Sequence, residues 1–133
     1  MNHYLEINLN TKQREELVNV TSQLQQTLDA SGVQTGILVA ASLHTTAAMT
    51  VNENADPDVV TDLLKHLAKL VPHQGSYHHS EGNSDAHIKT SLTGLSVTIP
   101  IQAGRLVLGT WQAVYFCEFD GPRRRKFSVQ IIS

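Results

Sequence analysis

The sequence is poor in cysteine, in aromatic residues and in charge. Its 133 residues include one cysteine, Cys117, so no intramolecular disulfide can form and a disulfide-stabilised secreted domain is excluded. The formal net charge of −2 disfavours a globally basic nucleic-acid-binding protein. Charged residues make up only 17% of the chain, and the apolar fraction of 41% is sufficient for a core, so the composition is not that of a disordered chain.

Long hydrophobic runs and targeting signals are also lacking. The longest apolar stretch, residues 36–43, is far shorter than the ~20 residues that a membrane-spanning helix needs. The first ten residues lack the basic and apolar regions of a signal peptide, so we expect a cytoplasmic protein. GxSxG, P-loop and GxGxxG motifs are missing, which leaves serine-hydrolase and nucleotide-loop functions without support. The length fits one domain, residues 1–133.

Two segments have the apolar spacing of main helices. The first spans residues 11–31, and Gly32 is a natural end for it. The second begins at Asp56-Pro57, with aspartate as N-cap and proline in the first turn, and ends before Pro72. A shorter helix is predicted over residues 85–92.

The remaining pattern is typical of β-strands. Residues 36–43 are apolar on both faces, which predicts a strand covered on both sides. The predicted strands span residues 3–9, 36–43, 48–52, 95–101, 106–119 and 125–132, and residues 106–119 form either one long strand or a bent pair of strands. We therefore expect an α+β fold, a β-rich sandwich or jelly-roll-like single domain with two main helices.

Histidines are concentrated in one region and near one strand end. Four of the seven lie between residues 73 and 87, and His44 follows the apolar strand. Three imidazoles, from His44, His79 and His87, would suit a catalytic zinc-type site with one open position. Spacing alone favours the alternative, in which the loop histidines are solvated and His44 is a half-buried polar residue.

A basic run, Arg123–Lys126, follows the Gly121-Pro122 turn. Arg125 shares strand parity with Phe127 and other apolar residues, so its side chain should point toward the core. A buried arginine needs an anionic partner, either a carboxylate or a bound anion. Arg123 can join a bound anion from the turn, and the alternative is a solvated strand edge.

Three further side chains are candidates for chemistry or for a structural role. Glu53 follows the His44 segment closely and could act as a general base or as a hydrogen-bond partner of a histidine. Gln112 stands among apolar residues, must find a hydrogen-bond partner and could therefore face a pocket. Cys117 is interpreted as a small core residue.

Six short motifs follow one another from residue 44 to residue 125. They are His44-Thr45-Thr46-Ala47-Ala48, Asn52-Glu53-Asn54-x-Asp56-Pro57, Tyr77-x-His79, Gly82-Asn83-x-Asp85-Ala86-His87-Ile88-Lys89, Gly104-Arg105-Leu106-x-Leu108-Gly109-Thr110-Trp111-Gln112 and Glu118-Phe119-Asp120-Gly121-Pro122-Arg123-x-Arg125. Together, and in this order, they resemble the YjbQ-like family, also called UPF0047.

The resemblance implies a compact β-sandwich-like α+β domain that assembles as a homotrimer. It implies a site around three histidines, matching His44, His79 and His87, often with a metal or an anion bound. His78 adjoins His79 and could replace it as a ligand. The family is associated with a weak, secondary thiamine-phosphate synthase activity, which joins a pyrimidine diphosphate to a thiazole phosphate and releases diphosphate.

Two functions remain open on this basis. The first is a metal-dependent enzyme acting on a phosphorylated small molecule, with zinc on the three histidines, or Mg²⁺ if the synthase activity holds. In it Glu53 and Gln112 are catalytic. The residues assigned to anion binding are Arg105, Arg123, Arg125 and Asn83. The alternative is a non-catalytic binding module for a phosphorylated metabolite, which the lack of a clear nucleophile favours.

Overall fold

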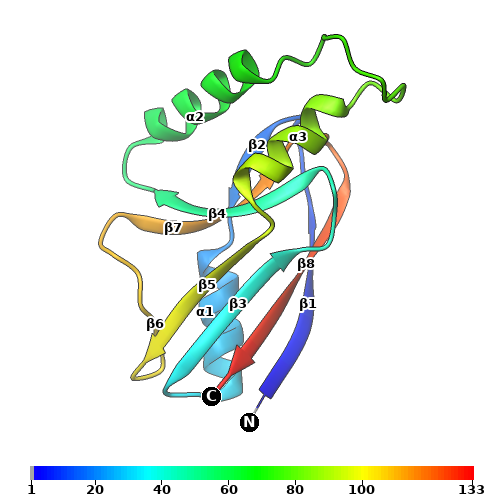
Figure 1. The fold of residues 1–133 in the computed structure, drawn as a ribbon. Coiled ribbons are helices and arrows are strands. Elements are labelled where there is room, and N and C mark those ends of the chain that lie inside the picture. The colour runs from blue at the N-terminus through cyan, green and yellow to red at the C-terminus, as the bar shows by residue number, and fades with distance from the viewer. Residues whose placement is uncertain (1) are drawn as a thin grey trace.

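Two antiparallel sheets and three helices make up residues 2–133, the part of the chain that the computed structural model describes (Figure 1). The strands are β1 (Asn2–Asn10), β2 (Glu16–Asn19), β3 (Gly36–Ser42), β4 (Ala47–Glu53), β5 (Ser96–Gln102), β6 (Arg105–Leu106), β7 (Gln112–Glu118) and β8 (Arg124–Ile132). The helices are α1 (Thr21–Ser31), α2 (Pro57–Leu70) and α3 (Ser84–Thr93). The α+β class is confirmed, and the short helix predicted near residues 85–92 is a full third helix.

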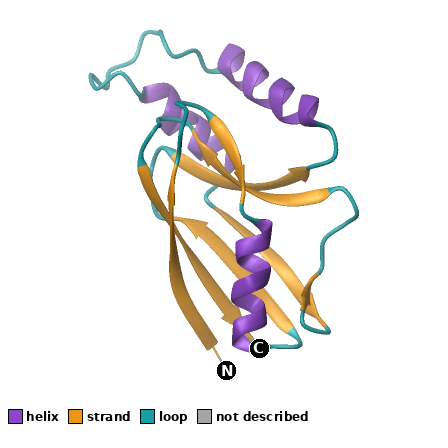
Figure 2. Cartoon of the chain, turned by 180° about the vertical axis from the view of Figure 1, so that it is seen from behind, coloured by secondary structure: helices purple, strands orange, loops and turns teal. Residues whose placement is uncertain are grey.

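The small sheet forms the middle layer of the molecule. Five strands form the large sheet in the order β1-β8-β3-β5-β6, and three form the small sheet in the order β2-β7-β4. One face of the small sheet shares the main core with the large sheet and with α1 (Figure 2). Its other face packs against α2 and α3. Strand β7 is therefore buried on both sides, with Phe116 in the main core and Tyr115 in the second.

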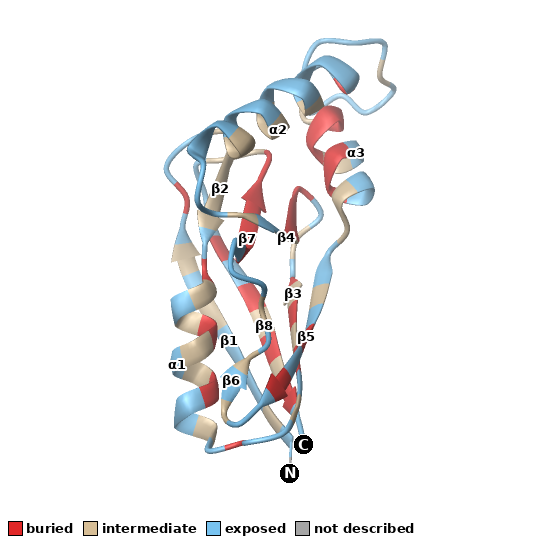
Figure 3. Ribbon diagram, turned by 90° about the vertical axis from the view of Figure 1, so that its left-hand side faces the viewer, coloured by how far each residue is buried: buried red, intermediate tan, exposed pale blue. Residues whose placement is uncertain are grey.

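The second helix lies over the small sheet with little of its surface buried. The carboxylate of Asp56 accepts the Asp58 backbone N–H at 2.9 Å, and Pro57 occupies the first turn, so the predicted helix start is confirmed. Leu64 and Leu67 pack against the second core, yet α2 has no fully buried residue, in contrast to α3 (Figure 3). Within residues 2–133 no helix is long and apolar enough to span a bilayer.

The predicted first helix is wrong over its first half. Residues 16–19 form β2, which pairs with β7 so that Leu17 lies opposite Cys117. A preceding turn is closed by the Glu16 carboxylate, which accepts the backbone N–H of Gln13 at 2.9 Å. The apolar residues in this segment fit both helical and strand spacing. The segment is extended because it pairs with β7, a strand in the core.

Two predicted strands also differ from the structure. Strand β3 is buried on one face only, at residues such as Leu38, while Ile37 is 38% exposed on the other. The strand covered on both sides is instead β7. Of the two forms predicted for residues 106–119, the single long strand is wrong, because an irregular segment, residues 107–111, separates β6 from β7.

A buried ion pair ties the ends of several strands together. Glu118 at the end of β7 is fully buried, and Arg125 near the start of β8 is 5% exposed. Arg125 Nε donates to Glu118 Oε1 at 2.8 Å, and a second guanidinium nitrogen contacts Oε2. The same guanidinium donates to Thr46 Oγ1 at 2.9 Å, and Thr11 Oγ1 donates to Glu118 Oε1 at 2.7 Å. The inward arginine predicted from strand parity therefore has a carboxylate partner.

Burial alone would raise the pKa of Glu118, but the hydrogen bonds from Arg125 and Thr11 reverse this effect and hold the pKa below its usual range. A carboxyl group whose pKa is lowered on folding stabilises the protein above its ordinary pKa. This contribution is lost as the pH falls through the lowered value.

Replacing Glu118 by glutamine should therefore destabilise the fold and change its acid sensitivity. Leaving Arg125 buried without its counter-charge should lower the free energy of unfolding by about 3–5 kcal/mol at neutral pH. The variant should also lose less stability than the wild type on acidification, because this carboxylate no longer titrates. Urea unfolding across acid and neutral pH measures both effects, with the exposed Arg124→Ala as control. If the free energy of unfolding fell equally steeply with decreasing pH in the variant and the wild type, the role assigned to Glu118 would be contradicted.

Candidate functional site

The turn between β3 and β4 positions His44. Ser42 Oγ accepts the His44 backbone N–H at 3.2 Å, and the imidazole Nε2 accepts the backbone N–H of Lys126 at 2.9 Å. Because Nε2 is an acceptor here, the neutral ring carries its proton on Nδ1. Burial and the positive charge of Arg125 lower the pKa of His44, although Glu118 acts in the opposite direction. The neutral imidazole is therefore favoured.

The other two predicted histidines lie side by side. His79 belongs to the loop between α2 and α3, and His87 lies on α3. Their ring centroids are 5.2 Å apart, and the rings are nearly perpendicular. His79 Nε2 lies 3.1 Å from the Asn83 side-chain oxygen and 3.7 Å from a carboxylate oxygen of Glu81.

Two open hollows meet at His87. The His79 hollow, about 360 Å³, is lined by Ser76, Tyr77, His78, His79, Ser84, His87 and Ile88. The His44 hollow, about 390 Å³, is lined by His44, Thr45, His87, Thr90, Ser91, Gly94 and Leu95. The structure thus brings the three histidines to α3, with His87 between the other two. His78 also faces the His79 hollow, so the choice between these neighbours stays open.

The donor atoms do not assemble into a metal site as they stand. Within the described part of the chain, no three His, Cys, Asp or Glu side chains form a group that could hold an ion. His44 already accepts a backbone N–H through Nε2, and His79 is engaged with Asn83. Neither hollow is lined by a carboxylate, the ligand that Mg²⁺ prefers. Zinc and magnesium both stay predictions.

The two residues predicted to be catalytic lie elsewhere. Glu53 and Gln112 face each other across β4 and β7, at the end of β4 remote from His44. Seven residues of strand separate that end from the His44 turn, roughly 20 Å at the usual rise. Gln112 is satisfied locally, because its side-chain oxygen accepts the Gly109 N–H at 2.7 Å. Nearness in sequence suggested a link between Glu53 and His44, and the extended strand separates them.

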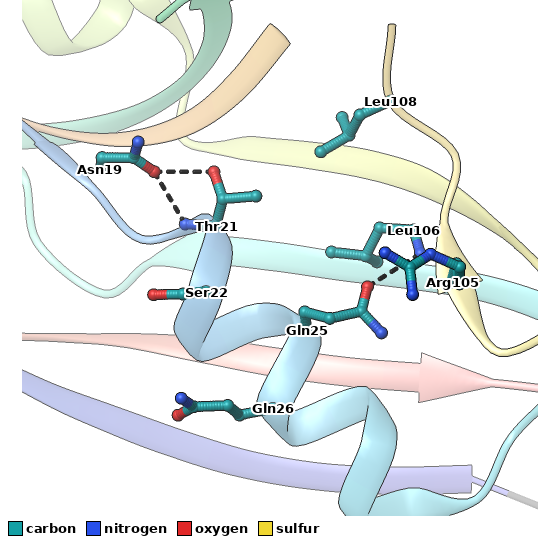
Figure 4. A pocket seen from close by; sticks show the side chains of 8 residues that line it. All are labelled: Asn19, Thr21, Ser22, Gln25, Gln26, Arg105, Leu106 and Leu108. Carbon is teal, nitrogen blue, oxygen red and sulfur yellow. Dashed lines mark hydrogen bonds between the residues drawn. The ribbon is translucent and has the colours of Figure 1, made fainter. Parts of the chain in front are cut away.

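The residues assigned to anion binding are dispersed. Arg125 is paired with Glu118, as described above. Arg123 is about half exposed and lies 3.0 Å from Asp120, which in turn accepts from the Asn83 side-chain nitrogen at 2.8 Å. Asn83 therefore links His79 to the Asp120–Arg123 pair. Arg105 lies apart, in a third hollow of about 690 Å³ beside α1 (Figure 4), lined by Asn19, Thr21, Ser22, Gln25, Gln26, Arg105, Leu106 and Leu108.

A buried charge cluster under α3 was not predicted. Asp85 and Lys89 are almost completely buried and lie 3.2 Å apart. Arg14 binds the Asp85 carboxylate at 3.1 Å, and Glu15 binds Lys89 at 2.7 Å. Burial tends to raise the pKa of Asp85, but hydrogen bonds from Arg14 and Lys89 lower it. The four-residue spacing of Asp85 and Lys89 on a helix was the available sequence signal.

Sequence comparison identifies the relatives of this chain. The profile of the family "UPF0047 protein YjbQ-like" matches residues 5–133. A UPF0047 protein of Methanocaldococcus jannaschii is 52% identical over 93% of this chain and 90% of its own length. The UPF0047 protein YugU of Bacillus subtilis is 40% identical over 95% of this chain and 96% of its own length.

Solved structures with the same fold include members of this family. An uncharacterised conserved protein of the YjbQ/UPF0047 family from Clostridium acetobutylicum is 51% identical and superposes with a TM-score of 0.95, covering 96% of this chain and 99% of that chain. A protein of unknown function from Sulfolobus solfataricus, 31% identical, gives a TM-score of 0.94 over 98% of this chain and 96% of its own. The resemblance seen in the six motifs is therefore confirmed, and the chain belongs to the UPF0047, YjbQ-like family.

Proposed function

We propose that the two hollows around His87 bind a phosphorylated small molecule. The observation that carries this proposal is the position of His87, which lines both hollows between His79 in one and His44 in the other. Imidazole N–H groups donate to phosphoryl oxygens and exchange protons near neutral pH. Neither hollow is lined by a carboxylate, and the acidic group nearest to these histidines is Glu81, 3.7 Å from His79 Nε2.

The distribution of arginines favours a single phosphoryl group. Of the three arginines assigned to anion binding, Arg125 is neutralised by Glu118 and Arg105 lies in the third hollow. Arg123 is linked to His79 through Asn83 and Asp120, and it is itself paired with Asp120. A diphosphate needs several cationic contacts or a metal ion. A phosphomonoester is therefore better supported than the diphosphate substrate of a thiamine-phosphate synthase.

The imidazoles are the groups in position to act as acid or base on a bound ester. We assign proton transfer to His79 or His87, whose rings adjoin in the His79 hollow. Binding without turnover is the second candidate function. It is favoured by the remote position of Glu53 and Gln112, which removes the expected partners of a histidine base.

Ligand binding tests the proposal directly. Inorganic phosphate and a set of phosphomonoesters should raise the melting temperature of the wild-type protein, because a ligand selective for the folded state stabilises it. His87→Ala should abolish this shift, whereas His66→Ala, an exposed histidine of α2, should retain it. Overnight incubation with a pyrimidine diphosphate and a thiazole phosphate, followed by product analysis, separates turnover from binding. No stabilisation of the wild type by any phosphate compound would overturn the proposal.

Elemental analysis tests the zinc prediction separately. A three-histidine zinc site predicts nearly one metal ion per chain in untagged protein purified without chelator, and its loss in His44→Ala. Absence of metal from both proteins would contradict zinc binding and leave the phosphate proposal, which needs no metal, intact.

We also propose that the chain forms the homotrimer implied by its family resemblance. Four aliphatic side chains are 39–64% exposed, namely Leu43 just after β3, Ile88 and Leu92 on α3, and Leu95 just after α3. Two of them line the histidine hollows. Exposed apolar patches of this kind mark protein contacts. A second copy here would place each hollow at a subunit boundary.

Sedimentation velocity should show a trimer for the wild type and a monomer for Leu92→Glu, because a carboxylate cannot be buried in an apolar contact without a partner. Leu70→Glu on α2 is the matched control, since Leu70 and Leu92 are 63% and 64% exposed. A monomeric wild type, or equal effects of the two substitutions, would contradict this interface.

A further inference from the structure

Two buried hydroxyl groups on α3 have no hydrogen-bond partner. Ser84 is 8% exposed and Thr90 is 7% exposed, and within residues 2–133 no group hydrogen-bonds to Ser84 Oγ or Thr90 Oγ1. A buried hydroxyl that has left water without gaining a partner destabilises the fold. Such groups are rare in folded proteins and require an explanation.

The two residues that carry these buried hydroxyls line different hollows. Ser84 lines the His79 hollow, and Thr90 lines the His44 hollow. His87 stands three residues after Ser84 and three before Thr90, so the three side chains form one i, i+3, i+6 row along α3. The row runs from one hollow to the other past the histidine that they share.

The Ser84 end of this row suits an anion. Ser84 begins α3, and the cap residue Asn83 makes no side-chain hydrogen bond to the helix. The Asn83 side chain is used instead by His79 and Asp120. The first N–H groups of α3 therefore lack a side-chain acceptor, and the helix dipole adds positive potential there.

The acidic residue in the first turn of α3 does not oppose an anion. Asp85 carries a full charge next to Ser84, but Arg14 and Lys89 both bind it, and Glu15 completes the cluster. Two positive and two negative groups leave this cluster formally neutral. The Asp85 cluster therefore adds no net negative charge beside the Ser84 hydroxyl and the helix N-terminus, and Asp120, which accepts from Asn83, is itself paired with Arg123.

The Thr90 end suits a neutral polar group. His44 offers a neutral imidazole to this hollow, and Leu95 adds an apolar wall. The six-residue spacing corresponds to about 9 Å along the helix axis. That length matches a phosphorylated ring compound rather than free phosphate.

We infer that Ser84 and Thr90 are the two anchoring hydroxyls of one ligand site that spans both hollows. The Ser84 hydroxyl donates to the phosphoryl group of a phosphomonoester at the start of α3, and the Thr90 hydroxyl binds a second polar group of the same molecule roughly 9 Å away. His87 contacts the ligand between them. This inference rests on the proposed function and adds the ligand's size and the position of its two polar ends.

Removal of either unpaired hydroxyl should leave the fold at least as stable as before. Removing an unpaired buried hydroxyl relieves its desolvation cost, so Ser84→Ala and Thr90→Val should melt at the same temperature as the ligand-free wild type or higher. Hydroxyls with a structural role would give the opposite result. A variant that is at least as stable but binds less tightly identifies a group kept for a ligand.

Nitrogen-15 NMR titrations of the full chain with inorganic phosphate and, separately, uridine 5′-monophosphate test the two anchors. Ser84→Ala should weaken both probes about fivefold, the effect of one hydrogen bond. Thr90→Val should weaken only the nucleotide, by a similar factor. Thr93→Val, on the same helix but outside both hollows, is the control and should bind like the wild type.

The outcomes separate this inference from the function on which it rests. If both hydroxyl variants bind the two probes like the wild type while His87→Ala does not, the anchoring role is wrong and the histidine site stands. If the wild type binds neither probe, the proposed function fails as well. Lower melting temperatures in both hydroxyl variants, with unchanged affinities, would show a structural role and overturn the inference.

Discussion

The buried pair of Glu118 and Arg125 is the contact on which the geometry around His44 depends. It joins the end of β7 to the start of β8. Hydrogen bonds to Thr11 and Thr46 connect it to the segment after β1 and to the turn before β4. Each partner would be costly to bury alone, so the pair constrains these four segments together. The neighbouring residue of β8, Lys126, then offers its backbone N–H to His44. The hydrogen bond that orients this imidazole therefore comes from the residue next to Arg125.

The third helix is the platform for the rest of the site. Its inward side packs Ala86 into the second core and holds the neutral cluster of Asp85 and Lys89 with Arg14 and Glu15. Its other side presents His87 between two hollows. Two hydroxyls without partners border these hollows, at a cost in stability that a ligand would offset. In the binding mode that we propose, an anion is held through hydrogen bonds and a helix terminus, with few formal charges.

Much of the fold, and part of the site, could be predicted from local patterns. Asp56-Pro57 predicts a helix start because capping is a local interaction. Strand parity predicts the burial of Arg125 because the alternation of side chains along a strand is also local. Residues 16–19 were misassigned because their apolar residues suit either spacing until β7 is beside them. The link drawn between His44 and Glu53 failed for a related reason, since sequence distance says nothing about the direction of the strand between them.

The family, the α+β class and most of the strand and helix positions can be read from local sequence patterns, as can the residues that are available for chemistry. Tertiary structure decided which of these residues meet. His87 lies between His44 and His79 in the folded chain. Arg105 lines a different hollow, and Arg125 is paired with a carboxylate. The tertiary structure also left Ser84 and Thr90 buried and unpaired, which no spacing could indicate. The physical reason is that capping, parity and turns act between neighbours in the chain, whereas a binding site is made by contacts between segments that only the packed fold brings together.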